Sequence, residues 1–390
     1  MFIERNISKI VQDFASFFPV LAIMGPRQSG KTTLVRHLFA NYHYLNLENL
    51  DLLELSKADP RGFLEGLLKY AGVIIDEFQN HPDLLSYLQI LVDREQRPGF
   101  FVLTGSHNFL MNQAIGQSLA GRVGILTLLP LAQSEINRAN LTVPSAEMAI
   151  YRGFYPRIVE SRSLPPSQIY PSYIQTYLER DLRTISHIAD LLLFKKFLGL
   201  CAGRVGQILN ISSLATDCGV SAKTVKSWLS ILEASYIVFL LQPHHANFNK
   251  RLIKNPKLYF YDTGIACSLL GIDSTEQLSN HYLRGALFEN LVVGDLTKQF
   301  YNVAKNPPLY FWRDNHGHEI DCLIETAGKF LPIEIKASMT MSKNFLKELQ
   351  FWKELANVEK GMLIYAGEEI QNIQHNQILN WQRIDILKAV

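Results

Sequence analysis

The chain has 390 residues, of which 47% are hydrophobic and 19% are charged. This composition is typical of a globular protein and excludes a disordered one, and the length allows roughly two to four domains with full cores. The net charge of +2, from 38 basic and 36 acidic residues, excludes a chain that is strongly basic throughout, as a purely electrostatic nucleic-acid binder would be, and leaves only local basic patches open.

The cysteines and the N-terminal region indicate where the protein is found. Cys201, Cys218, Cys267 and Cys322 are scattered without a C-x-x-C pair, which predicts buried thiols in a reducing compartment. The apolar residues 14–24 lead straight into a phosphate-loop motif, so they belong to the fold and not to a signal peptide. No stretch approaches the ~18 apolar residues that a membrane span requires. A cytoplasmic protein without membrane contact is expected.

The first motif is a phosphate-binding loop at residues 25–32, which matches G-x-x-x-x-G-K-[ST] in full. An apolar run before it predicts a buried strand, and apolar residues at helical spacing after it predict a helix from about Gly30. Glycines let backbone N–H groups approach phosphates, Lys31 reaches the β/γ-phosphates, and the Thr32 hydroxyl ligates Mg²⁺. ATP and Mg²⁺ are the predicted cofactors, with nucleotide contacts from Gly25, Pro26, Arg27, Gln28, Ser29, Gly30, Lys31, Thr32 and Thr33.

Two further strands are predicted to end at the same site. The apolar run 73–75 ends in Asp76 and Glu77, which looks like a Walker B strand. Asp76 is expected to hold Mg²⁺ through water, and Glu77 to polarise the attacking water; a solvated acidic turn is the alternative. The strand over 100–104 ends near Thr104 and Ser106, and Ser106 either senses the γ-phosphate or caps the strand.

Alternating strand and helix patterns predict an α/β protein that begins with a parallel sheet. The expected strands are 20–25, 43–47, 72–76, 100–104 and 124–129, within a first domain over residues 1–135. A mostly helical linker is expected over 136–195, including one helix face formed by Tyr173, Tyr177, Leu178 and Leu182.

Residues 196–275 carry the pattern of a winged helix-turn-helix. Val225, Trp228, Leu229 and Leu232 recur on one face of a helix that Ser221 is expected to cap, and Gly219 supplies the preceding turn. Strands over 236–241 and 257–261 would form the wing. DNA contact would use basic side chains of the helix and the wing; the alternative is an interdomain or oligomerisation module, because a recognition helix usually offers more base-reading side chains. The basic residues are Lys223, Lys226, Lys250, Arg251 and Lys254.

Residues 276–390 contain a second set of candidate catalytic residues. Two alternating segments, 319–324 and 332–336, flank Ala327-Gly328, which favours a hairpin. Strand period places Glu334 and Lys336 on one face, and pairing would bring Asp321 beside them. This D…E-x-K pattern is typical of metal-dependent nucleases, in which carboxylates bind Mg²⁺ and the lysine activates water or stabilises charge. The alternative is an amphipathic hairpin with a solvated polar face.

Three further side chains are candidate metal ligands near this hairpin. Glu289 shares a helix stripe with Val293, Leu296 and Phe300, so its inward carboxylate needs a partner or a metal, and Glu289, Asp321 and Glu334 are the predicted metal ligands. His316 and His318 flank the segment, but without zinc spacing they are expected to be loop residues.

Together these motifs resemble the bacterial and archaeal AAA-type ATP-binding proteins with a C-terminal region long described as of unknown function. The resemblance covers essentially the whole chain and adds the motifs at 104–106, 121–122, 153–156, 177–181, 257–264 and 284–289. It implies a P-loop AAA-type core, a helical linker, a winged helix and an α/β PD-(D/E)XK nuclease-like domain. Ile320 stands where such domains often have proline before Asp321.

The resemblance also implies a role for Arg122. In AAA-type enzymes an arginine at this place acts as a finger on a neighbour's γ-phosphate, which would require a homo-oligomer. The alternative is an arginine that pairs with a helix dipole or with Glu135.

The output of the ATPase remains open between two hypotheses. One is a nuclease acting on DNA or RNA through Glu334 and Lys336; the other is an ATP-switched module that binds DNA or protein without cleaving. No helicase-type motif supports a DNA-remodelling motor.

Overall fold

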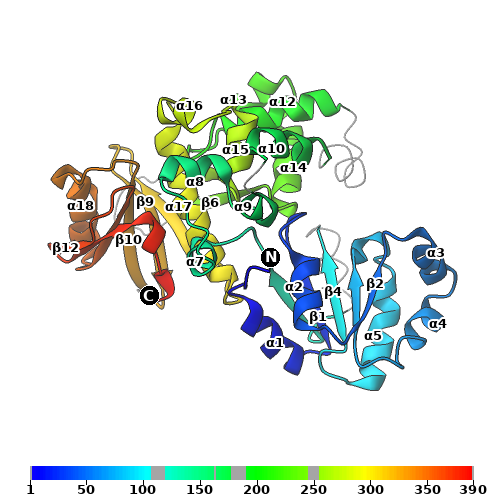
Figure 1. Ribbon diagram of the computed structural model, residues 1–390. Coiled ribbons are helices and arrows are strands. Elements are labelled where there is room, and N and C mark those ends of the chain that lie inside the picture. Colours follow the sequence, from blue (N-terminus) through cyan, green and yellow to red (C-terminus); the bar gives the residue numbers. More distant parts are fainter. Residues whose placement is uncertain (1, 107–118, 162–163, 177–189, 245–253, 389–390) are drawn as a thin grey trace. The chain divides into compact units, whose positions relative to one another are not determined.

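The computed structural model describes residues 2–106, 119–161, 164–176, 190–244 and 254–388 (Figure 1). The chain forms two compact units. Unit 1 comprises residues 1–131 with the short segments 234–236 and 301–305, and unit 2 comprises 132–233, 237–300 and 306–390. None of the helices in the described ranges combines the length and apolar character that a membrane crossing requires.

Unit 1 is built on a five-stranded parallel sheet in the order β2-β3-β4-β1-β5. The five predicted strands are all present, as β1 (Val20–Met24), β2 (His43–Asn46), β3 (Val73–Asp76), β4 (Phe101–Gly105) and β5 (Val123–Thr127). Every residue of β1, β3 and β4 is buried, which explains why these strands read as continuous apolar runs. Because β4 lies between β1 and β3, the carboxyl ends of these three strands meet at one edge.

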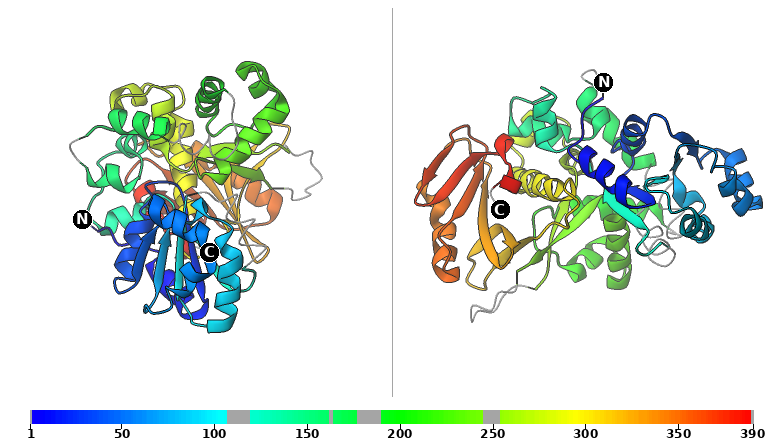
Figure 2. Two further views of the ribbon diagram at one scale, coloured as in Figure 1. Left: turned by 90° about the vertical axis from the view of Figure 1, so that its right-hand side faces the viewer. Right: turned by 90° about the horizontal axis from the view of Figure 1, so that it is seen from below.

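Helices cover the strands of unit 1, and Figure 2 shows them from two further directions. They are α1 (Ser8–Phe17), α2 (Lys31–Leu38), α3 (Leu50–Ala58), α4 (Pro60–Glu65) and α5 (Leu84–Glu95), with a 3₁₀ turn η1 (Phe78–Asn80) after β3. One core cluster joins Val11 of α1, Leu34 and Val35 of α2, and Leu21 and Ile74 of the sheet. The apolar face of α2 thereby fixes the helix whose first turn follows the phosphate loop.

The first part of unit 2 is helical. It contains α7 (Gln133–Arg138), α8 (Ala146–Arg152), α9 (Pro156–Glu160), α10 (Pro166–Thr176), α12 (Leu191–Ala202), α13 (Ile211–Cys218) and α14 (Ala222–Ala234). At the predicted helix-turn-helix, α13 and α14 flank Gly219, which has φ +84°, and the Ser221 hydroxyl accepts from the Thr224 N–H at 3.0 Å. Of the helix face predicted from Tyr173 onward, residues 177–189 lie outside the described residues.

The two strands predicted as a wing belong to a larger sheet. β6 (Val238–Pro243) pairs antiparallel with β7 (Lys257–Phe260), but its end also pairs parallel with β8 (Leu309–Arg313). An eight-stranded mixed sheet results, in the order β12-β13-β11-β10-β9-β8-β6-β7. The limit predicted at residue 275 therefore falls within a continuous sheet, and the division into four domains stays a prediction.

The remaining described elements of unit 2 are the other strands of this sheet and further helices. They are α15 (Thr263–Leu269), α16 (Thr275–Ser279), α17 (Arg284–Tyr301), β9 (Glu319–Thr326), β10 (Lys329–Lys336), η3 (Lys343–Leu346), α18 (Lys347–Ala356), β11 (Gly361–Tyr365), β12 (Gln371–Ile373), β13 (Asn376–Asn380), η4 (Trp381–Arg383) and η5 (Ile386–Lys388). The predicted hairpin joins β9 and β10 through Ala327 and Gly328, both at positive φ. The largely buried α17, yellow in Figure 2, carries Glu289.

Two of the motifs behind the family resemblance meet at a buried carboxylate, Asp262. It accepts hydrogen bonds from the Phe154 N–H and the Tyr170 hydroxyl, both at 2.7 Å, and from the Gly264 N–H at 3.0 Å. A Cβ atom on Gly153 would lie 2.1 Å from Asp262 Oδ1. These contacts join the helices around α10 to the segment that follows β7.

Candidate nucleotide site and C-terminal acidic cluster

The phosphate loop has the predicted strand–loop–helix geometry. α2 begins at Lys31 with Gly30 as its N-cap at φ +95°, and a Cβ atom on Gly25 would lie 2.1 Å from a backbone oxygen. Both positions therefore require glycine. The Lys31 ammonium donates to the backbone oxygens of Gly25 at 2.9 Å and Pro26 at 2.8 Å, so it is held at the loop itself. Ser29 is buried, and its hydroxyl has no hydrogen-bond partner among the described residues.

The remaining loop residues differ in exposure. Gln28, at φ +62°, and Thr33 are exposed. Arg27 is partly buried, with Nη1 3.9 Å from Glu48 Oε1. Arg27 and Lys31 bring two positive charges to one edge of the sheet, as a triphosphate site requires.

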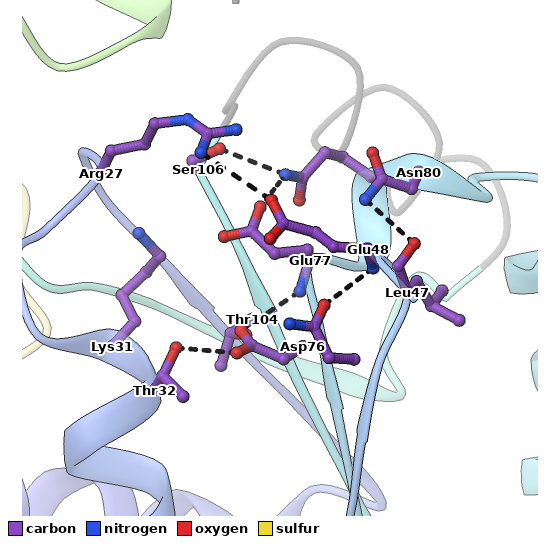
Figure 3. Close-up of polar contacts among 12 residues, drawn as sticks. Arg27, Lys31, Thr32, Leu47, Glu48, Asp76, Glu77, Asn80, Thr104 and Ser106 are labelled. Carbon is purple, nitrogen blue, oxygen red and sulfur yellow. Dashed lines mark hydrogen bonds and ion pairs between the residues drawn. The ribbon is translucent and has the colours of Figure 1, made fainter. Parts of the chain in front are cut away.

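Asp76 is the centre of the site's hydrogen bonding (Figure 3). Its Oδ2 accepts from the Thr32 hydroxyl at 2.8 Å and from the Tyr44 hydroxyl at 2.7 Å, and its Oδ1 accepts from the Thr104 hydroxyl and from the Glu77 N–H. The structure thus joins Thr32 and Asp76, the two residues predicted to serve Mg²⁺. A hydroxyl and a carboxylate are hard oxygen donors, so this pair fits Mg²⁺. Thr104 contacts Asp76, and Tyr44 is a partner that sequence reasoning missed.

Glu77 is connected to Ser106 through Gln79. The Gln79 amide N–H donates to Glu77 Oε2 and also to the Ser106 hydroxyl, at 3.2 Å. Burial raises the pKa of Glu77, and this shift is opposed by the charges of Lys31 and Arg27 and by the Gln79 hydrogen bond. Ser106 is therefore linked to the candidate catalytic carboxylate through Gln79. Gln79 was missed because it lies in η1, beyond the motif.

Arg122 lies at the opposite edge of the sheet. It immediately precedes β5, and its backbone oxygen accepts from the N–H of Val20 at the amino end of β1, whereas the phosphate loop follows the carboxyl end. Arg122 forms a two-point ion pair with Asp93, with Nη2 2.9 Å from Oδ2. Its carboxylate partner is thus Asp93; Glu135, the partner considered from the sequence, accepts from the Ala132 N–H. The family resemblance also implies a helix over residues 109–119 before Arg122, and residues 107–118 lie outside the described residues.

The C-terminal hairpin brings three predicted side chains together. The antiparallel register pairs Ile333 with Cys322, which places Glu334 opposite Asp321. The Lys336 ammonium lies 3.2 Å from Glu334 Oε1 and 3.5 Å from Asp321 Oδ2, and Asp321 Oδ2 also accepts from the Ile335 N–H at 2.8 Å. Burial, assisted by the charge of Asp321, holds the pKa of Glu334 well above its ordinary value.

Glu289 has the partner that its inward position required. Its Oε1 accepts from the Lys257 ammonium at 2.8 Å and from the Tyr259 hydroxyl. Lys257, only 3% exposed, also lies 2.5 Å from Oε1 of Glu319, whose Oε2 is 3.0 Å from Arg313 Nη1. Burial opposes the charge of Lys257, but the carboxylates around it, chiefly Glu289, outweigh burial and raise its pKa. Sequence reasoning missed this lysine, although a lysine at the head of the apolar run 257–260 was a signal.

The predicted metal ligands fit a metal ion only in part. Within the described ranges, no three His, Cys, Asp or Glu side chains are arranged to hold a metal. The Glu334 Oε2 atom is buried beside Asp321 and has no hydrogen-bond partner among the described residues, so this pair fits a cation. Glu289 does not fit, because Lys257 already neutralises it.

Both histidines lie in the loop between β8 and β9, as expected from the sequence. The His318 ring stacks on Phe351, and its Nδ1 lies 3.0 Å from Glu348 Oε2. His316 follows Asp314, whose carboxylate accepts from the His316 backbone N–H.

Family models match three consecutive regions of the chain. An AAA domain matches residues 18–137, a domain of unknown function (DUF8612) matches 144–276, and a second domain of unknown function (DUF4143) matches 284–384. Two relatives, each described as an uncharacterized protein, come from Mycobacterium tuberculosis and Mycobacterium bovis. Each is 32% identical over 387 residues, covering 95% of this chain and 83% of the relative. This chain belongs to their family.

The AAA domain indicates ATP binding, which in such domains usually involves Mg²⁺, and it is consistent with ATPase activity. Among solved structures, a Walker-type ATPase of Pyrococcus abyssi is 15% identical with a TM-score of 0.47, and covers 69% of this chain and 96% of its own. The RuvB Holliday junction branch migration motor of Thermotoga maritima is 18% identical with a TM-score of 0.29, over 60% of this chain and 86% of its own. Both scores are low, so neither likeness bears on the function of this chain.

Proposed function

We propose that unit 1 binds and hydrolyses ATP with Mg²⁺. The observation that carries this proposal is the hydrogen bond between Thr32 and Asp76, which joins the phosphate loop to the Walker B strand beside Glu77. Lys31 and the backbone N–H groups of the loop would hold the phosphates, and Thr32 and Asp76 would hold Mg²⁺, which would neutralise phosphate charge. Glu77, fixed by Gln79, would orient the attacking water, and Ser106 would report the γ-phosphate to Gln79.

We also propose that Arg122 completes the site of a neighbouring subunit. Its position at the amino edge of the sheet, away from its own phosphate loop, supports action in trans. Its pairing with Asp93 would hold the guanidinium until a neighbour's γ-phosphate competes for it. ATP hydrolysis would then depend on a homo-oligomer assembled head to tail.

The proposed output is action on nucleic acid by the C-terminal PD-(D/E)XK-like region, under control of the ATP site. Convergence of Asp321, Glu334 and Lys336 on one face of the hairpin supports this. If a metal serves this site, Asp321 and Glu334 would hold it and it would stabilise charge on a phosphodiester. The exposed Lys223 and Lys226 of the helix-turn-helix would contribute phosphate contacts.

The second candidate is an ATP-switched module that binds DNA or protein without cleaving it. The pairing of Glu289 with Lys257 favours this candidate, because it removes one expected metal ligand. The two candidates differ in a simple respect. Only the first predicts products from DNA or RNA in Mg²⁺ or Mn²⁺ that disappear in Lys336→Ala.

ATP binding and turnover test the primary proposal. Wild-type protein should bind ATP and release phosphate in Mg²⁺. Lys31→Ala should lose binding by at least about tenfold, since a charge-assisted contact to phosphate is removed. Lys9→Ala, an exposed lysine on α1, is a matched control and should bind ATP as the wild type does. Equal ATP binding by wild type and Lys31→Ala would refute the assignment of the loop.

A further inference from the structure

Lys257 is a deeply buried lysine that reaches the acidic cluster from a strand at the edge of the sheet. It belongs to β7, at the edge of the eight-stranded sheet, whereas the carboxylates it meets come from α17 and β9. Its ammonium lies between Glu289 Oε1 at 2.8 Å and Glu319 Oε1 at 2.5 Å. A lysine with 3% exposure is rare in a folded protein unless its charge is compensated.

The fold holds this ammonium in place through the backbone. The Asn290 amide bonds to both the N–H and the carbonyl oxygen of Phe260, at 2.8 and 2.7 Å, and so fastens β7 to α17. Strand period two then directs Lys257 and Tyr259 to the same side, where both donate to Glu289. The Lys257 side chain therefore has less conformational freedom than a surface lysine. Its contact with Glu289 follows from the position of β7.

Basic side chains of the protein neutralise most of the negative charge of the cluster. Four carboxylates, from Glu289, Glu319, Asp321 and Glu334, face three cations, from Lys257, Arg313 and Lys336. Lys336 serves the pair at the hairpin, Arg313 serves Glu319, and Lys257 serves Glu289 and Glu319. Neutralising such a carboxylate group is the electrostatic task of a divalent metal in an acidic site. A metal bound by Glu289 would have to displace Lys257 or lie against its positive charge.

We propose that Lys257 is a built-in cation that takes the place of a metal ion at Glu289. The cluster would then bind a divalent metal tightly only when this ammonium group is withdrawn, for example by a shift of β7 away from α17. The proposal concerns regulation of the site proposed above to act on nucleic acid, and rests on that function for its consequence. Metal binding by the cluster can nevertheless be measured without any cleavage.

The test is Mn²⁺ binding to the full-length, nucleotide-free chain, followed by the loss of the free Mn²⁺ signal in electron paramagnetic resonance. All proteins carry Asp76→Asn, which silences the metal site proposed in unit 1. Lys257→Met, which keeps the aliphatic length and removes the charge, should bind one Mn²⁺ at least tenfold more tightly than the unaltered cluster. Lys257→Arg, which keeps the charge, should not. Adding Glu334→Gln to Lys257→Met should abolish the gain.

Two outcomes would overturn the proposal. The first is equal Mn²⁺ affinity in Lys257→Met and Lys257→Arg. The second outcome is measured without any change at Lys257, so it remains available if Lys257→Met fails to fold. A tight Mn²⁺ site in the Asp76→Asn protein that disappears with Glu334→Gln or Glu289→Gln would mean that Lys257 does not exclude the metal. If no variant cleaves DNA or RNA while the Mn²⁺ results hold, the proposed nuclease function fails and the role of Lys257 stands.

Discussion

Gln79→Leu should slow ATP hydrolysis while leaving ATP binding intact. Gln79 touches neither the phosphate loop nor Asp76 among the contacts described; it donates to the Glu77 carboxylate and to Ser106. Leucine has a similar size and no donor, so the substitution releases the carboxylate that is proposed to orient the attacking water. The change is therefore expected in kcat, with KM for ATP close to that of the wild type.

The magnitude follows from the hydrogen bond that is lost. A hydrogen bond to a charged group contributes about 1.5–3 kcal/mol, and each 1.36 kcal/mol of transition-state stabilisation corresponds to about a factor of ten in rate. If the bond serves to position the carboxylate, kcat should fall roughly ten- to hundredfold. The Gln79 donor also lowers the raised pKa of Glu77, so its removal should move the acid limb of the pH–kcat profile to higher pH.

The assay is steady-state phosphate release at saturating Mg-ATP, over a range of pH. Asn80→Leu is the matched control. The Asn80 side-chain amide donates to the Leu47 backbone oxygen at 3.3 Å, and the bond from the Asn80 backbone N–H to the Glu77 backbone oxygen is kept in the variant. Its kcat should stay within about twofold of the wild type, because the partly buried hydrogen bond that is lost joins neutral groups and does not reach the Glu77 carboxylate. A Gln79→Leu protein with unchanged or increased kcat, or with a change confined to KM, would refute the positioning role.

His81→Asn should flatten the acid side of the curve of stability against pH. Burial lowers the pKa of folded His81, which bonds to Ser56, below its ordinary 6.5, so its contribution to stability is present above pH 6.5 and is lost as the pH falls toward the folded pKa. Thermal unfolding at several pH values should show this loss in the wild type and not in the variant. Asn290→Leu leaves the buried N–H and carbonyl of Phe260 without their partner, so it should lower the free energy of unfolding, measured by urea titration, by about 2–4 kcal/mol. A loss below about 0.5 kcal/mol would contradict the role of Asn290 in holding β7 against α17. Arg122→Ala should reduce kcat at least about tenfold without changing the melting temperature, and full activity in this variant would exclude the arginine finger.

The nucleotide site was largely predictable because its information is local. Each of its strands is an apolar run, and the residues that follow, such as Lys31 and Asp76, occupy fixed places in short motifs. The topology of the parallel sheet alone then places these strand ends side by side. Gln79 and Tyr44 escaped prediction because they reach the site from a 3₁₀ turn and from a neighbouring strand, where no motif marks them.

The C-terminal cluster was predictable only within its hairpin. Two-residue turn geometry and strand period place Glu334 beside Asp321, and both can be read from about twenty consecutive residues. The contact between Lys257 and Glu289 depends on how β7 packs against α17, and the pairing of β6 with β8 joins strands far apart in the chain. Such long-range pairings have no local sequence signal, so the ion pair between Glu289 and Lys257 could not be predicted from the sequence.

A comparison of ATP binding with ATP turnover in Glu77→Gln tests the central claim most directly. Glutamine keeps the shape of the side chain but cannot act as the carboxylate that orients water. If unit 1 is an Mg²⁺-dependent ATPase with Glu77 in this role, the variant should bind ATP as tightly as the wild type while its phosphate release falls at least about a hundredfold. Undiminished phosphate release by Glu77→Gln, or none by the wild type at saturating Mg-ATP, would contradict the account.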